Sequence, residues 1–243
     1  MTVSVLLAAC LPNEAWFKEQ LDSILPQLAD ADELLVSDDS PPENRRAEQI
    51  TAQYAAENPR IHYVTGPHQG TATANVEHLL RLAKGEILVL SDQDDVWNPE
   101  KLEAIRKAFA ENPEALCVLH DAAQTDTCLN VTVPSLFHAR GVKLGIIHNL
   151  LKNGYQGSCM AVHRALLKTA LPFPKGLPMH DQWLGLSAEI EGGSVLLPQV
   201  LLYYRRHPGA VTGRKTSLAQ KLRWRMGIAA PLLRKLLHLS MKE

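Results

Sequence analysis

The sequence predicts an α/β fold with a doubly wound, mostly parallel sheet that carries helices on both faces. Within the first 112 residues, short apolar segments alternate four times with segments of helical periodicity, which is the pattern of strand–helix units. The run at residues 87–90 contains no polar residue, so we expect a strand buried on both faces, as in a parallel sheet. A chain of 243 residues is long enough for one such domain with a substantial core.

Each strand–helix unit has its own local signals. Asn13 can cap the first helix, and Pro26 is expected to end or kink it. Gly85 is expected to end the third helix, and Asn98-Pro99 has the form of a cap followed by proline at the first helical position. The expected strands are residues 3–9, 33–37, 61–65 and 87–91. Four helices are expected to alternate with them. The first follows Asn13, the second spans about residues 43–57, the third carries Val76, Leu79, Leu80 and Ala83, and the fourth carries Leu102, Ile105 and Phe109.

The pattern loosens after a fifth strand at residues 116–120. Residues 122–155 are predicted to be loop with one weak helix around residues 142–151, and residues 157–162 form a candidate strand. A helix is expected from Asp181 to Ile190. The apolar segment after it, residues 195–204, is expected to be a strand interrupted by Pro198.

The net charge of −1 conceals two regions of opposite charge. From residue 205 to the end the chain has ten Lys/Arg and one acid, so this part carries +9, whereas residues 1–204 carry −10. Residues 214–243 also have apolar residues at helical spacing, which predicts a basic amphipathic helix divided in two by Pro231. Such a helix is typical of binding to anionic lipid, and the alternative is a helix that packs on the domain with its charges in water.

The four cysteines, Cys10, Cys117, Cys128 and Cys159, show no metal-binding spacing. We interpret them as reduced thiols in or near the core of a cytosolic protein. Residues 7–10 imitate a lipoprotein cleavage site, but no basic segment precedes them, so we assign them to the first strand. The chain has no run of 18 apolar residues, and no membrane-spanning helix is expected.

Acidic residues end two of the predicted strands and recur in a third segment. These segments are Asp38-Asp39, Asp92-Gln93-Asp94-Asp95 and His180-Asp181. Ligands of open α/β sheets bind at the carboxyl ends of the strands, where these carboxylates would repel one another without a cation. Oxygen ligands on a short turn suit Mg²⁺ or Mn²⁺. The alternative interpretation is a solvated acidic loop.

Three common motifs are missing, and their absence narrows the function. The chain has no Walker glycine pattern, which argues against ATP hydrolysis of the P-loop type. No GxGxxG follows the first strand, which argues against a dinucleotide cofactor, and no GxSxG is present, which disfavours an α/β-hydrolase. A nucleotide phosphate held through a metal remains the favoured ligand.

Six short sequence blocks follow one another along the chain. They are Val3-Ser4-Val5-Leu6-Leu7-Ala8, Gln20-Leu21-Asp22-Ser23-Ile24, Ser37-Asp38-Asp39-Ser40, Ser91-Asp92-Gln93-Asp94-Asp95-Val96-Trp97, His180-Asp181-Gln182-Trp183 and Tyr204-Arg205-Arg206-His207. In this order they resemble the family 2 glycosyltransferases with the GT-A fold. The resemblance covers roughly residues 2–213 and is closest to bacterial rhamnosyltransferase-like members that build surface polysaccharides.

The resemblance implies a role for each acidic block. Asp38 would bind the base of a nucleotide-sugar, and Asp92 and Asp94 would be the DxD pair that binds Mg²⁺ or Mn²⁺ on the diphosphate. Asp181 would be the catalytic carboxylate, and His207 would lie near the diphosphate and the metal. The full set of implied nucleotide-sugar contacts is Ala8, Asp38, Asn75, Asp92, Gln93, Asp94, Asp95, Trp97 and His180.

The implied activity is transfer, with inversion, of one hexose or deoxyhexose from a nucleotide-diphosphate sugar to a hydroxyl of a saccharide acceptor. The product would be bacterial surface polysaccharide or lipopolysaccharide, and the acceptor would be a saccharide or a lipid-linked saccharide. Residues 1–213 would form the GT-A domain, with a nucleotide-sugar half at 1–115 and an acceptor half at 116–213, followed by the basic tail at 214–243. The enzyme would be cytoplasmic, peripheral at the inner face of the membrane, with no nucleic-acid partner.

The chain departs from the family pattern in three places. Ala9-Cys10-Leu11 stands where many members have Thr-Tyr-Asn, so the resemblance leaves the base selectivity open. Gln182 stands where many relatives have an aromatic residue. The Gln-x-x-Arg-Trp block of the processive synthases is absent, which favours the addition of single sugars.

Each of these residues also has a structural alternative. Asp38 suits a turn before Pro41-Pro42, and Asp181 suits a helix cap. His207 suits a surface position after a strand, and Trp97 suits the core. For the whole protein, the alternatives are a nucleotidyltransferase on a similar sheet and a degenerate transferase domain that acts as a binding module.

Overall fold

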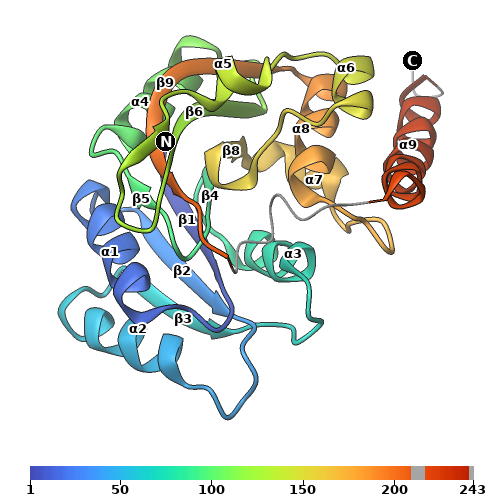
Figure 1. Cartoon of the computed structure of the whole chain (residues 1–243). Coiled ribbons are helices and arrows are strands. Elements are labelled where there is room, and N and C mark those ends of the chain that lie inside the picture. The colour runs from blue at the N-terminus through green and yellow to red at the C-terminus, as the bar shows by residue number, and fades with distance from the viewer. Residues whose placement is uncertain (209–216, 241–243) are drawn as a thin grey trace.

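The computed structural model describes residues 1–208 and 217–240, with the side chains at positions 218, 221 and 236–240 not among them (Figure 1). The predicted boundary between residues 213 and 214 lies outside the described residues, as do both ends of the predicted tail. Within this part of the chain, nine strands form one sheet. The strands are β1 (Val3–Ala9), β2 (Glu33–Asp38), β3 (Ile61–Thr65), β4 (Ile87–Ser91), β5 (Val96–Trp97), β6 (Cys117–Thr125), β7 (Val131–Val133), β8 (Met160–His163) and β9 (Ser194–Arg205).

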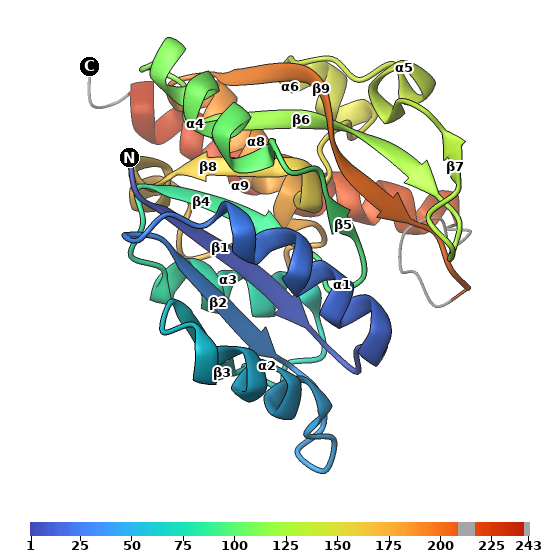
Figure 2. The same ribbon diagram turned by 90° about the vertical axis from the view of Figure 1, so that its left-hand side faces the viewer.

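The sheet is mixed but mostly parallel, as the sequence predicts. Its order is β3-β2-β1-β4-β8-β6-β9-β5, with β7 paired to β6. Strands β1 to β4 and the β6–β9 pair are parallel, whereas β8 and β5 run antiparallel to their neighbours. In β1 and β4 the apolar side chains are buried, because helices cover both faces of the sheet (Figures 1 and 2).

Two layers of helices enclose this sheet. Figure 2 shows α1, α2 and α4 on one face, and α3, α8 and α9 on the other. The helices are α1 (Glu14–Ile24), α2 (Arg46–Glu57), α3 (Ala72–Leu82), α4 (Lys101–Glu111), α5 (Leu136–Arg140), α6 (Ile146–Leu151), α7 (Leu167–Ala170), α8 (His180–Glu191) and α9 (Leu218–Ser240), with short 3-10 turns η1 (Leu25–Gln27), η2 (Gly157–Cys159) and η3 (Arg164–Leu166). The side chain of Asn13 caps α1 by accepting from the Trp16 amide, and α1 ends at Ile24, two residues before Pro26, as predicted.

Register at the centre of the sheet aligns the ends of three strands. Ala8 lies opposite Ser37, and Leu7 lies opposite Ser91, so β1, β2 and β4 end at the same edge. The residues that follow these strands therefore meet there, including the acidic segments at 38–39 and 92–95. Parallel pairing thus brings together residues that are more than 50 positions apart in the sequence.

The second half of the chain differs from the prediction. Strand β6 continues to Thr125, and β7 and α5 lie in a segment predicted to be loop. Strand β6 can contain a buried polar residue because protein groups hydrogen bond to its side chain. The Asp121 carboxylate accepts from the Ala122 and Phe137 amides and from the Ser135 hydroxyl. Strand β8 begins only at Met160, because the 157–159 segment forms the turn η2.

Pro198 does not interrupt β9. In the neighbouring strand β6, His120 pairs with Leu197 and Asp121 pairs with Val200, so Pro198 and Gln199 bulge out of the sheet. Both residues are exposed. The proline, which has no backbone N–H, therefore occupies a position that needs no hydrogen bond to the neighbouring strand. The strand reaches Arg205 at the edge where β1, β2 and β4 end.

Two helix predictions were also wrong. Helix α4 begins at Lys101 and not at Asn98, because Asn98 forms a turn in which its side chain accepts from the Glu100 amide. Helix α9 continues past Pro231 without dividing. Ile228 and Leu232, on either side of this proline, are both buried against the domain, and this packing offsets the cost of the lost helical hydrogen bond.

The structure also corrects the assignment of two cysteines. Cys117 and Cys159 are buried as expected, but Cys10 and Cys128 are exposed. Over the described residues, no helix combines the length and the apolar composition needed to cross a bilayer.

Candidate active site

The acidic segments of the sequence converge on one edge of the sheet. Asp92 follows β4, and Asp181 lies in the first turn of α8, yet the charge of Asp181 acts on Asp92. Asp94 belongs to the same cluster, and His207 reaches it from the end of β9. The structure thus brings together the predicted DxD pair, the predicted catalytic carboxylate and the predicted metal-binding histidine.

Asp92 lies at the centre of this cluster. Its side chain is exposed at this edge of the sheet, and the Ser158 hydroxyl interacts with it. Desolvation by the surrounding protein groups, together with the charges of Asp94 and Asp181, raises the pKa of Asp92. Such an excess of negative charge is what a bound cation would neutralise.

Asp94 and His207 form the best-defined pair of candidate metal ligands. His207 Nε2 lies 2.8 Å from Asp94 Oδ2, both side chains are partly buried, and the Trp16 ring packs on the imidazole at a centroid distance of 4.9 Å. The two side chains are hydrogen bonded directly to each other, and a cation bound here would take the place of this contact.

No group of three His, Cys, Asp or Glu side chains arranged to hold a metal occurs among the described residues. Proteins usually bind Mg²⁺ through one or two carboxylates, while substrate phosphates and water complete the coordination. The donor set at Asp94 and His207 therefore fits an ion that arrives with a diphosphate.

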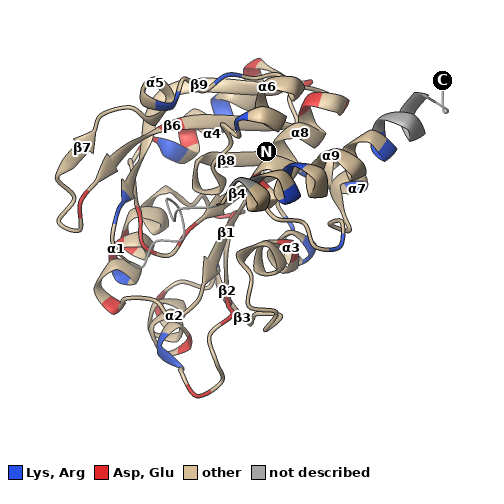
Figure 3. Cartoon of the chain, turned by 45° about the vertical axis from the view of Figure 1, so that its right-hand side comes forward, with Lys and Arg blue, Asp and Glu red and all other residues tan. Residues whose placement is uncertain are grey.

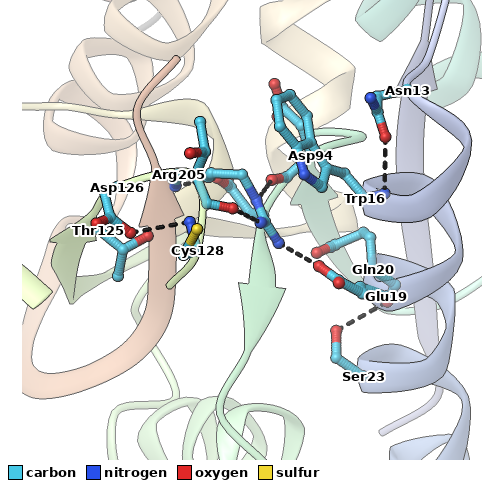
Figure 4. Close-up of polar contacts among 12 residues, drawn as sticks. Asn13, Trp16, Glu19, Gln20, Ser23, Asp94, Thr125, Asp126, Cys128 and Arg205 are labelled. Carbon is cyan, nitrogen blue, oxygen red and sulfur yellow. Dashed lines mark hydrogen bonds and ion pairs between the residues drawn. The ribbon is translucent and has the colours of Figure 1, made fainter. Parts of the chain in front are cut away.

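Arg205 supports this pair from beneath (Figure 4). Its guanidinium is buried and donates to the Asp94 carbonyl at 2.9 Å, to the Thr127 carbonyl at 2.6 Å and to the Glu19 carboxylate. The Arg205 amide donates to Asp95 Oδ1 at 3.0 Å. Arg205 thus joins α1, the 92–95 turn and the β6–β7 turn.

Asp95 faces the interior and not the open edge. It is fully buried, and burial together with the charges of Asp94 and Asp92 raises its pKa well above the usual range. Its position suits a residue that orients the 92–95 turn. Trp97 is also in the core, where Lys101 Nζ lies 3.9 Å from the ring centroid. Burial lowers the pKa of Lys101 to about 7.

Asp181 does not cap its helix. Helix α8 begins at His180 with Met179 in the cap position, and Asp181 Oδ1 accepts from the Gln182 amide at 2.7 Å. Burial raises the pKa of Asp181 and lowers the pKa of His180. Gln182, where many relatives have an aromatic residue, is buried and donates to the Asn149 carbonyl.

The predicted nucleotide contacts on β1 and β2 are engaged with protein groups. Asp38 is buried and accepts from the Ser40 amide and hydroxyl and from the Tyr63 hydroxyl, as its alternative role in a turn implies. Burial and the Asp38 charge raise the pKa of Tyr63 to about 12. Asn75 links the ends of β1 and β2, since its amide donates to the carbonyls of Ala9 and Ser37.

Gln93 ties the end of β1 to the 92–95 turn. Its side chain accepts from the Cys10 amide at 2.7 Å and donates to the Cys10 carbonyl at 3.0 Å, a two-point contact with the backbone. Ala8 is partly buried on β1 beside these groups. The segment that departs from the family pattern is therefore held by Gln93 from the 92–95 acidic block, and the Cys10 thiol and Leu11 amide also contact the residues just after β2.

Sequence reasoning did not single out two charged residues of this site, Arg205 and Lys101. Arg205 stood inside one of the six blocks, but nothing in the sequence marks it as buried. Lys101 lies behind the 92–95 turn, where its ammonium donates to the Ser158 carbonyl; Gly157-Ser158 were candidates for the acceptor pocket or for a strand edge. The only sequence signal for Lys101 is its place six residues after Asp95, on the helix that comes after the acidic turn.

A family comparison bears directly on this arrangement. Residues 4–170 match the family model described as Glycosyl transferase family 2, which is more than half of the chain. The chain belongs to glycosyl transferase family 2. The family predicted from the sequence is thereby confirmed, whereas its rhamnosyltransferase-like branch is not tested.

Curated relatives of this family 2 chain are distant. An uncharacterized glycosyltransferase of Methanocaldococcus jannaschii is 29% identical over 111 residues, which is 45% of this chain and 38% of the relative. An uncharacterized protein of Mycobacterium tuberculosis is 25% identical over 200 residues, or 80% of this chain and 56% of the relative. The chain thus spans about two fifths to just over half the length of these relatives.

Solved structures show the same fold. S. aureus TarS (residues 1–349), in complex with UDP-GlcNAc, has a TM-score of 0.71 at 20% identity, covering 96% of this chain and 67% of that one. The mannosyltransferase PcManGT from Pyrobaculum calidifontis, in complex with GDP-Man and Mn²⁺, has a TM-score of 0.62 at 18% identity, covering 99% and 64%. These likenesses confirm the predicted GT-A fold of this family 2 protein.

Proposed function

We propose that this protein transfers a single hexose or deoxyhexose from a nucleotide-diphosphate sugar to a hydroxyl of a saccharide acceptor, with a divalent cation and with inversion. One observation carries this proposal: Asp92, the Asp94–His207 pair and Asp181 lie together where β4 ends. A metal-bound diphosphate and a general base are the two parts that this reaction needs, and both have candidate residues at this edge.

Asp181 is the proposed base. Displacement at an anomeric carbon requires the acceptor hydroxyl to lose its proton as it attacks, and a positioned carboxylate can accept that proton. The raised pKa of Asp181 makes it a stronger base than an ordinary aspartate. A single base on the face opposite the leaving group gives inversion, as in inverting glycosidases.

Asp94 and His207 would hold Mg²⁺ or Mn²⁺, and Asp92 would add a further carboxylate on the same side. When bound, the ion stabilises the negative charge of the departing nucleoside diphosphate. Arg205 contributes by holding the Asp94 backbone, so that the carboxylate is fixed before the ligand arrives.

The ligands of the two solved relatives support a nucleotide-sugar donor, since TarS was crystallised with UDP-GlcNAc and PcManGT with GDP-Man and Mn²⁺. For this chain the donor remains a proposal. We place the reaction in bacterial surface polysaccharide or lipopolysaccharide synthesis, with a rhamnosyltransferase-like role, because of the block Ser91–Trp97.

A panel of nucleotide-sugars with and without Mn²⁺ tests the donor proposal. We expect one donor to raise the melting temperature only when Mn²⁺ is present, because the ion links the diphosphate to Asp94 and His207. A ligand at 100 times its Kd stabilises the folded state by about 2.7 kcal/mol. Thermal shift measures the effect, and stabilisation of equal size without metal would contradict a metal-bound diphosphate.

We also propose that the protein works at an anionic membrane, peripheral to its inner face, where a lipid-linked acceptor would be available. Helix α9 has one buried apolar side, with Ile228 and Leu232, and a second apolar stripe that is exposed. The stripe consists of Leu222, Met226 and Leu233, each 57–59% exposed, at helical spacing. Lys and Arg residues lie along the same helix (Figure 3).

Helix α6 extends this apolar surface. Ile147 is 77% exposed and Leu151 is 63% exposed, one turn apart on α6. Arg225 of α9 donates to the Leu151 carbonyl at 2.7 Å, so the two helices lie side by side. Helix α9 thus both packs on the domain and exposes apolar and basic side chains, which reconciles the two alternatives for the tail.

Changing Leu222, Met226 and Leu233 together to serine is expected to reduce binding to anionic vesicles at least tenfold, because three apolar side chains no longer enter the interface. Co-sedimentation with phosphatidylglycerol vesicles measures the binding, with phosphatidylcholine vesicles for comparison. Leu82→Ser, an exposed leucine on α3, is the matched control and should bind like the unaltered protein. Equal sedimentation of the triple variant would reject the membrane role.

A further inference from the structure

Lys101 has an unusual environment for a lysine. It is the first residue of α4, which packs across β6 and β9 (Figure 2), and its side chain is 0% exposed. Over the described part of the chain, no carboxylate forms an ion pair with it. Burial of an ammonium without a paired charge is costly, so a lysine at this position calls for a reason beyond packing.

The Lys101 ammonium contacts the turn that lies beside the candidate active site. Nζ donates to the Ser158 carbonyl at 2.9 Å and lies 3.9 Å from the centroid of the Trp97 ring. Asp95 and Asp92 are close enough for their charges to act on it. Lys101 therefore places its amino group on the protein side of the acidic cluster, bonded to the 157–159 turn.

The turn held by Lys101 touches both parts of the site. The carbonyl of Ser158 accepts from the Lys101 ammonium at 2.9 Å, and its hydroxyl interacts with the Asp92 carboxylate. Gly157 packs against His180, since a Cβ at this glycine would lie only 2.9 Å from Nε2. A displacement of this turn would move Asp92 and the His180–Asp181 pair at the same time.

Unpartnered polar atoms accompany this arrangement. Among the described residues, Asp95 Oδ2, Trp97 Nε1 and His120 Nε2 are buried without a hydrogen-bond partner. His120 Nδ1 is 2.8 Å from the Asp121 carbonyl, so Nδ1 carries the proton and Nε2 is an acceptor. A core selected for stability alone would not keep an ammonium and three such atoms together.

We propose that Lys101 is a positioning residue of the transfer site, whose buried ammonium holds the 157–159 turn and thereby sets Asp92 and the His180–Asp181 pair. The inference rests on the proposed function. A positioning role and a purely structural role predict different effects of replacing Lys101. A neutral side chain of similar length would remove the buried amino group and retain the packing. Function and stability should therefore change in opposite directions.

The test compares Lys101→Met with Lys107→Met, a control on the exposed side of the same helix. We expect Lys101→Met to unfold at the same temperature as the unaltered protein or at a higher one. Its affinity for Mn²⁺ with UDP, or for Mn²⁺ with GDP, should fall at least tenfold in calorimetric titration. Lys107→Met should change neither quantity.

Ser158→Ala provides a second variant that keeps the carbonyl bond to Lys101 and removes the hydroxyl that interacts with Asp92. We expect it to weaken Mn²⁺–nucleotide binding by a smaller factor, and to weaken it no further when Lys101→Met is already present. If Lys101→Met lowers the unfolding temperature, or binds Mn²⁺–nucleotide within twofold of the unaltered protein, the positioning role is wrong. Failure of the unaltered protein to bind either nucleotide with Mn²⁺ would instead refute the proposed function, and the inference with it.

Discussion

Asp181→Asn is expected to lower the rate of sugar transfer by roughly 10²–10⁴-fold while the affinity for the nucleotide-sugar stays within a factor of a few. Asparagine has the same shape and can still accept from the Gln182 amide, so the first turn of α8 should persist. It cannot accept the proton of the acceptor hydroxyl. Steady-state kinetics with the donor identified by thermal shift measures the first effect, and calorimetry measures the second.

Asp30→Asn is the control for this variant, since Asp30 is exposed on the turn before β2, at the amino end of the strand. The pH dependence gives a further check. The base is active only when ionised, and burial raises the pKa of Asp181, so transfer should decline on acidification at a higher pH than an ordinary aspartate would cause. Turnover of Asp181→Asn at the unaltered rate would remove Asp181 from the mechanism.

Asp94→Asn, or removal of the metal with a chelator, is expected to lower transfer by roughly 10²–10³-fold, because the departing diphosphate loses its charge stabilisation. The variant should also lose Mn²⁺-dependent nucleotide binding, because the amide oxygen of asparagine is a weaker metal ligand than the carboxylate oxygen of Asp94. Isothermal titration with Mn²⁺, in the presence and absence of nucleotide, measures this loss independently of turnover.

Chelation and mutation should behave differently when metal is restored. Mn²⁺ or Mg²⁺ should recover the activity of the chelated protein but not that of Asp94→Asn. The matched control is Glu100→Gln, which alters an exposed carboxylate ahead of α4 that makes no side-chain cap. Full activity in excess chelator would exclude the cation from the reaction.

The first half of the fold is predictable because its signals are local. Each of the first four strands is a short apolar run, and Asn13 and Pro26 mark the ends of α1 by their own backbone preferences. The acidic edge obeys a general rule, since parallel strands end together and the residues after each strand therefore lie side by side. No knowledge of distant contacts is needed for these steps.

The second half depends on contacts that no local pattern contains. Strand β6 carries Asp121 in the core, and only the partners at Ser135 and Phe137 make that burial possible. Pro231 remains inside α9 because residues on both sides of it are buried against another part of the chain. In the site, Lys101 and Arg205 escaped prediction for the same reason, since charged residues are expected at the surface unless a tertiary partner is known.

Arg205 also constrains how the protein is made. Its guanidinium touches groups at positions 19, 94 and 127, so the support beneath Asp94 is incomplete until the chain has been synthesised beyond β9. A fragment limited to residues 1–115 would contain the acidic turn but lack this arginine, so the backbone of Asp94, the proposed metal ligand, would lose this support. We therefore expect the acidic turn to take its final form only after residues far along the chain have folded onto it.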